Sequence, residues 1–192
     1  MATAEQVAFS IREEGRGVHV VLWDDQADLV RALLVVTAGL KGIPIYGLLV
    51  PDRDEDLISL RSLADSRTVE EENDALKSPA DSLWLLFIPP AASKRVGPWL
   101  NGWRRPLSQP PGTLLAVRHA DFESFQRNAP DLASYFGPRI YDAATMISVW
   151  SKETDSRLES ELAIEIQEIL KRLPGTPPSK SEIDEWRALH SP

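Results

Sequence analysis

The sequence predicts an α/β protein with a three-layer fold, in which a five-stranded, mostly parallel sheet in receiver- or Rossmann-like order precedes a C-terminal helical tail. Five short apolar runs recur along the chain, with helix-like segments between them. Several runs are continuously apolar, as is typical of strands buried on both faces. After residue 151 the apolar spacing changes to one long helical stripe. We therefore expect a core domain over residues 1–151 and a helical tail over 152–192.

The predicted strands are rich in Val, Ile, Leu and aromatic residues. They are residues 18–23, 43–50, 82–88, 113–118 and 145–150. The first connection is predicted as a helix with Asp24 or Asp25 as its N-cap and Gly42 as its stop. Its apolar positions at helical spacing are Leu29, Leu33, Val36 and Leu40.

The later connections are less regular. We expect a helix through Leu57, Leu60 and Leu63 that gives way to a polar stretch over 68–81, either a mobile loop or a short second helix. A short helix is predicted with Pro98 in its first turn and an end before Pro106. After the fourth strand, two short helices are expected to meet at Ala129–Pro130.

The tail carries an apolar stripe on an otherwise acidic helix. Its positions are Leu158, Leu162, Ile166, Ile169 and Leu173. Burial of each large side chain contributes on the order of 1.5–3 kcal/mol, so the stripe is expected to pack on its own sheet, on a partner or on a second copy of the chain. A last short helix is predicted through Ile183, Trp186 and Leu189.

Composition excludes several classes of function. The net charge is −8 and the pI is near 4.9, which argues against binding of duplex nucleic acid. The chain has no cysteine, so disulfides, thiolate metal sites and cysteine nucleophiles are excluded. No apolar run approaches the roughly 20 residues of a membrane helix, and the N-terminus lacks the pattern of a signal peptide. We expect a cytoplasmic protein.

The turn after the first strand is acidic where many α/β proteins bind phosphate. It offers Asp24, Asp25 and Asp28 in place of glycines and a lysine, which disfavours a nucleotide in the usual pose. Two readings remain: the carboxylates cap the following helix, or Asp24 and Asp25 bind magnesium as the acidic pair of a receiver domain does. The third strand ends without the acceptor aspartate that a working receiver needs, although Lys152 follows the fifth run.

Sequence motifs of catalysis are absent. There is no GxSxG elbow and no HExxH or calcium-loop spacing. His119, beside Asp121 and Glu123 at the exit of a strand, has no nucleophile near it in sequence. We therefore expect a protein that is not an enzyme and that needs no cofactor.

A basic and aromatic group interrupts the acidic chain between residues 94 and 127. Arginine with tryptophan is typical of protein interfaces and also suits single-stranded nucleic acid, whereas the alternative is that the tryptophans are core residues and the arginines are surface residues. The candidate interaction residues are Arg95, Trp99, Trp103, Arg104, Arg105, Arg118 and Arg127, together with Leu158, Leu162, Ile166 and Ile169 of the tail.

Residues 99–136 contain Leu100-Asn101, Arg104-Arg105, the apolar run 114–117 and Ala129-Pro130-Asp131-Leu132. This segment resembles the STAND and AAA-type NTPase regions that precede tetratricopeptide repeats in bacterial signalling and defence proteins. Such NTPases carry a Walker A loop upstream, whereas this chain has the acidic turn. The resemblance implies an NTPase-like core without its nucleotide, acting as a recognition or regulatory module beside a larger NTPase.

Overall fold

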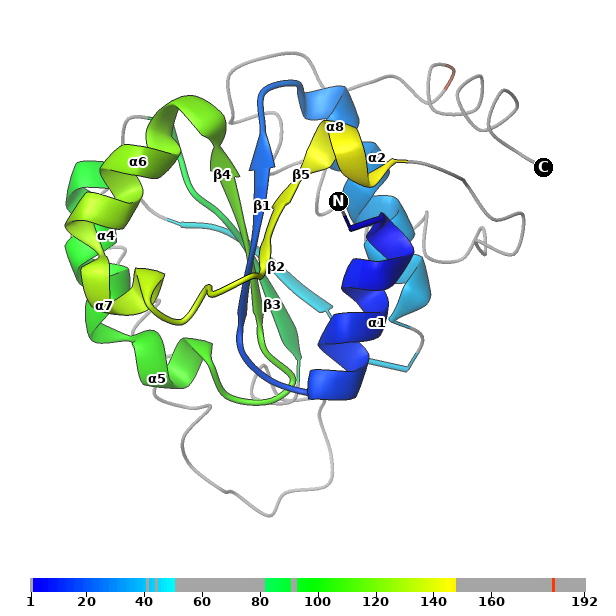
Figure 1. Cartoon of the computed structure of the whole chain (residues 1–192), viewed down its shortest axis with the longest axis horizontal. Coiled ribbons are helices and arrows are strands. Elements are labelled where there is room, and N and C mark those ends of the chain that lie inside the picture. Colours follow the sequence, from blue (N-terminus) through cyan, green and yellow to red (C-terminus); the bar gives the residue numbers. More distant parts are fainter. Residues whose placement is uncertain are drawn as a thin grey trace.

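The computed structural model describes residues 2–40, 42–43, 45–50, 82–90, 93–147 and 181, and its sheet is parallel. Every strand pair runs parallel, and the order is β2-β3-β4-β1-β5 (Figure 1). The predicted α/β class is confirmed. The strands are β1 (Val18–Trp23), β2 (Ile45–Leu49), β3 (Leu83–Phe87), β4 (Thr113–Arg118) and the three-residue edge strand β5 (Ile140–Asp142).

The position of β1 differs from the predicted receiver- or Rossmann-like order. In a receiver-like order of 2-1-3-4-5 the first strand lies between the second and the third. Here β1 lies between β4 and β5. Because parallel strands end at the same edge of a sheet, the C-terminal ends of β4, β1 and β5 are brought together.

The predicted strand over 145–150 is wrong where the structure describes it. The edge strand β5 comes earlier, and Ala143–Met146 form the short helix α8. Asp142 starts this helix: its Oδ1 accepts a hydrogen bond from the Thr145 amide at 3.0 Å, and its backbone carbonyl accepts one from the Thr145 hydroxyl. The cap therefore overrides the strand propensity of the β-branched residues that follow.

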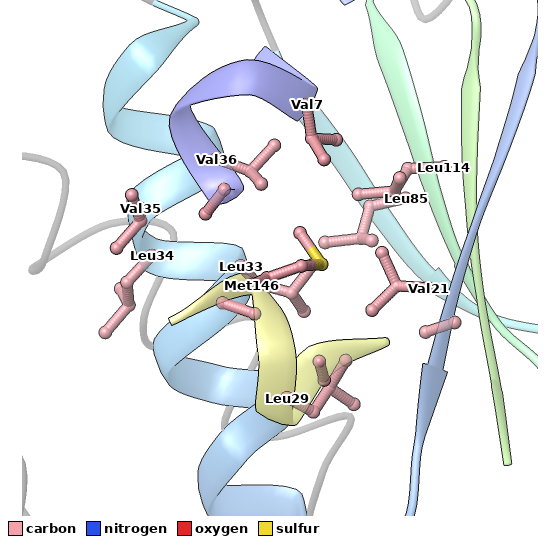
Figure 2. Close-up of a cluster of buried hydrophobic side chains, with 14 of the residues drawn as sticks. Val7, Val21, Leu29, Leu33, Leu34, Val35, Val36, Leu85, Leu114 and Met146 are labelled. Atoms are coloured by element: carbon pink, nitrogen blue, oxygen red, sulfur yellow. The ribbon is translucent and has the colours of Figure 1, made fainter. Parts of the chain in front are cut away.

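One face of the sheet is covered by α1 (Ala4–Glu14), α2 (Gln26–Gly39) and α8 (Figure 1). Their apolar side chains form one cluster with the sheet, in which Val7, Leu33 and Met146 meet Val21 and its neighbours (Figure 2). Helix α2 is capped by Asp25, as predicted, but it ends with Leu40 as its C-cap and not at Gly42.

Helix α1 was not predicted, although its sequence signals are clear. Thr3 and Gln6 form a reciprocal capping box, and Gly15 ends the helix in the left-handed conformation with φ of 59°. Its buried residues are Ala4, Val7, Ala8 and Ile11, at helical spacing.

The opposite face is covered by α4 (Ser93–Gly102), α5 (Arg104–Leu107), α6 (His119–Asn128) and α7 (Pro130–Ala133). The predicted break between two helices at Ala129–Pro130 is confirmed. The prediction of Pro98 in a first turn is wrong, because Pro98 lies inside α4, whereas the predicted end of that helix before Pro106 agrees with its end at Gly102; Pro106 lies in the separate helix α5. Pro98 is exposed on α4, and Pro106 falls in a first turn, where backbone amides need no helical partner.

Three predicted elements lie outside the described residues. They are the helix through Leu57, Leu60 and Leu63, the stripe of the tail, and the last short helix through Ile183, Trp186 and Leu189.

Candidate functional site

The C-terminal ends of three adjacent strands bring one histidine between two aspartates. His119 follows β4, Asp24 follows β1 and Asp142 ends β5. His119 Nδ1 lies 3.1 Å from Asp24 Oδ2, and its Nε2 lies 3.1 Å from Asp142 Oδ2. Nδ1 is buried and makes no hydrogen bond, so its contact with Asp24 is one of close approach only. We call these three residues the acid–histidine cluster.

The cluster lies where an open α/β sheet ordinarily binds its ligand. Strand β1 leads into α2 on one face of the sheet, whereas β4 leads into α6 on the other. The crevice between two such strand ends is the usual ligand site of parallel sheets. The sequence singled out Asp24 and His119 separately, but their contact depends on the strand order.

The N-terminus of α2 is occupied by the chain itself. Asp25 Oδ1 accepts a hydrogen bond from the Ala27 amide at 2.7 Å, and Asp28 pairs with Arg31 at 3.3 Å. The amides that would bind a phosphate in a glycine loop therefore already have an anionic partner. This geometry agrees with the capping reading of Asp25.

The two aspartates of the magnesium hypothesis have different partners. Asp25 caps α2, whereas Asp24 faces His119. The two ring nitrogens of His119 face different carboxylates, Asp24 and Asp142. Within the ranges that the structure describes, no group of three or more His, Cys, Asp or Glu residues is placed to hold a metal ion.

Arg118 is separated from the other candidate arginines. Its guanidinium carbon lies 5.7 Å from the centroid of the Trp23 ring, which belongs to the cluster on the α1–α2 side of the sheet. A cation over an indole face is stabilising. Arg118 therefore lies beside the crevice at the end of β4, away from α4.

The remaining described candidates lie on the helices of the other face, which we call the α4–α7 face. Trp99 and Trp103 pack together with ring centroids 4.3 Å apart, and Trp103 is only 8% exposed. Trp103 is thus a core residue, and Trp99 is the tryptophan that reaches the surface. Arg95 and Arg105 are exposed, while Arg104 and Arg127 each have an acidic neighbour, Asp131 at 3.8 Å and Glu123 at 3.5 Å.

The residues that carry the NTPase resemblance contact one another. The side chain of Asn101 accepts a hydrogen bond from the Leu132 amide at 2.8 Å and donates one to Asp131 at 3.2 Å. Arg104 donates to the Asn101 carbonyl at 3.2 Å. The Leu-Asn and Ala-Pro-Asp pieces of the segment are therefore linked by a hydrogen-bond network that fixes α4 to the start of α7.

A second polar group lies at the other end of β1 and was missed in the sequence. His19 is fully buried, its Nδ1 lies 3.3 Å from the Tyr141 hydroxyl, and burial lowers its pKa from 6.5 to about 4. Burial also raises the pKa of Tyr141. Arg139 donates hydrogen bonds to Glu14 and so lowers the pKa of that carboxyl.

Comparison with protein-family models, with curated proteins and with solved structures finds no match to this chain. The described helices include none that has both the length and the apolar character needed to cross a bilayer.

Proposed function

We propose that this chain is a non-enzymatic, NTPase-like module that binds another protein through the α4–α7 face. The NTPase-like part of this proposal is supported by the resemblance of residues 99–136, in which the side chain of Asn101 joins the Leu-Asn piece to Asp131 and Leu132. In the described residues, parallel strands in the order β5-β1-β4-β3-β2 have helices on both faces of the sheet.

The observation that carries the proposal is the acidic occupation of the crevice. Asp24 and Asp25 precede α2 and Asp28 lies in its first turn, so three carboxylates surround a helix terminus that offers only about half a positive charge. Two unit charges about 6 Å apart interact by roughly 0.7–3 kcal/mol for effective dielectric constants between 80 and 20. Several such repulsions disfavour a polyphosphate by orders of magnitude.

The α4–α7 face has the opposite charge. Helices α4, α5, α6 and α7 together contain five Lys and Arg and three Asp and Glu, a net charge of +2 in a chain of −8. Trp99 adds a partly exposed aromatic ring among these cations. Arginine with an aromatic anchor is the usual composition of an interface centre, so the partner offers an acidic surface. We propose a cytoplasmic, bacterial signalling or defence NTPase as that partner.

Titration calorimetry with magnesium, and with magnesium plus ATP, tests the non-enzymatic part. We expect no saturable heat at ligand concentrations on the order of 1 mM, which corresponds to a binding free energy weaker than about −4 kcal/mol. A saturable site that disappears in the double variant Asp24→Asn and Asp25→Asn would refute the proposal and favour a magnesium-dependent phosphotransfer enzyme.

Charge reversal on the proposed face tests the protein-binding part. The variant Arg95→Glu with Arg105→Glu should lose the partner that co-purifies with the native chain, while Arg12→Glu, on the opposite face, should retain it. Retention by the double variant would exclude the α4–α7 face. Quenching of tryptophan fluorescence by a single-stranded oligonucleotide at low salt would instead favour nucleic acid as the ligand of this face.

A further inference from the structure

A shallow, mostly apolar groove runs along α1 and reaches the C-terminal end of α2. Its volume is about 400 Å³. It is lined by Glu5, Gln6, Ala8, Phe9, Arg12 and Gly39. Phe9 is 57% exposed although it lies beside the main apolar cluster, whereas its helix neighbours Ala8 and Val7 are buried. The groove is therefore an apolar surface that a further element could cover.

The floor of the groove is formed by a close approach of two helices. A Cβ on Gly39 would lie only 2.6 Å from the Cβ of Ala8. These two small residues let α1 and α2 pack closely, so no side chain rises between Phe9 and α2. Burial of the exposed part of Phe9 by another helix would be favourable, because it removes apolar surface from water.

We propose that the groove is the docking site of this chain's own tail, residues 152–173. The last described helix before the tail is α8, which packs against α2 (Figure 2). Ile147, which follows it, packs on the same apolar cluster. The chain then continues for 45 residues, beginning with the segment that carries the apolar stripe. The last described residue before the tail therefore lies on the side of the sheet where the groove lies.

The connection is long enough for this docking. The eleven residues from Ile147 to Leu158, the first residue of the stripe, can span up to about 36 Å when extended. The distance along α2 from Leu33 to Gly39, which lines the groove, is only about 9 Å, because each helical residue rises about 1.5 Å. The chain can therefore bring Leu158 from α8 to the groove without strain.

Charge favours the tail as the occupant. Glu159 and Glu165 are each three residues from Leu162, so on a helix they flank the stripe. Arg12 is a half-exposed cation at the edge of the groove, 5.9 Å from the Phe9 ring centroid. A docked stripe would cover Phe9 and place a carboxylate near Arg12.

Docking in this groove does not depend on the proposed function, because it involves neither the crevice nor the α4–α7 face. The native chain has no cysteine, so a thiol-specific crosslinker reacts only with the two cysteines that are introduced. We would combine Glu5→Cys with Glu159→Cys or Glu165→Cys in the full chain and measure crosslinking by a short bismaleimide. The matched control replaces Glu5→Cys by Ala120→Cys, on the exposed surface of α6 at the opposite face.

If the tail is docked, the variants with Glu5→Cys should form a crosslinked monomer roughly tenfold or more faster than the variants with Ala120→Cys. The crosslinking rate should not depend on protein concentration. Adding Phe9→Asp should reduce that rate to the control value, with an unchanged circular dichroism spectrum as the check of folding. Equal rates for the Glu5 and Ala120 pairs, or no effect of Phe9→Asp, would overturn the proposal. Crosslinks that form only between chains would assign the groove to a second copy and also overturn it.

Discussion

The buried histidine of β1 is expected to make the stability of the domain depend strongly on pH. Its folded-state pKa of about 4 is below its ordinary value of 6.5. Between these values the unfolded chain binds more protons than the folded one, so the stabilisation is complete above pH 6.5 and is lost as the pH falls toward 4. At about 1.4 kcal/mol per pKa unit, the difference between 6.5 and about 4 corresponds to about 3.5 kcal/mol in full, of which about 3 kcal/mol is lost between pH 7 and pH 4. His19 is buried, so this effect is not that of a surface group.

The variant His19→Gln removes the titrating group and keeps a polar side chain near the Tyr141 hydroxyl. Urea unfolding followed by tryptophan fluorescence at pH 7, 6, 5 and 4 gives the free energy of unfolding of each protein. The native protein should lose about 3 kcal/mol more than the variant over this range. The Glu14→Gln variant is the control: because the pKa of Glu14 is lowered below 4.5, its contribution is lost only at the acidic end. Identical slopes for the native protein and His19→Gln would refute the assignment.

Three further outcomes can be checked by the same unfolding assay. Gly97→Ala should cost roughly 1–3 kcal/mol, because its Cβ would lie 2.8 Å from the Cβ of Asn128, whereas Gly102→Ala in the same helix meets nothing within 4 Å and should be neutral or stabilising. Asn101→Ala should cost about 1–2 kcal/mol, since the Leu132 amide loses its acceptor. His119→Ala should cost at most about 1 kcal/mol, because the ring is 36% exposed, and the difference should shrink at high salt.

Local features of the chain were predictable because they depend on neighbouring residues. The bounds of β1 and β4 agree with the apolar runs 18–23 and 113–118. The Asp25 cap and the break at Pro130 follow from short-range stereochemistry. Strand β5 was misplaced because its three residues are only half-buried and form no apolar run that a sequence pattern could identify. The cap at Asp142 then starts a helix where the apolar run 145–150 predicted a strand.

The site could be predicted only in pieces. Asp24, His119 and Asp142 are separated by 95 and 23 positions in the sequence, and no local pattern connects them. They meet because β1 pairs with β4 on one side and with β5 on the other, which is a non-local property of the sheet. The core position of Trp103 could not be predicted either, because a tryptophan surrounded by arginines in the sequence occurs both at interfaces and at the edge of a core.

The charge of the crevice connects the two halves of the proposed function. His119 lies between Asp24 and Asp142 and occupies the space between these carboxylates from within the chain. In the proposed function, the acidic side chains at the strand ends disfavour an incoming phosphate. Positive charge is instead concentrated on the α4–α7 face, where Arg95 and Arg105 are exposed beside Trp99. For the proposed partner, an acidic surface would be attracted to that face and repelled from the acidic strand ends, so one charge distribution would both disfavour a bound polyphosphate and orient the partner.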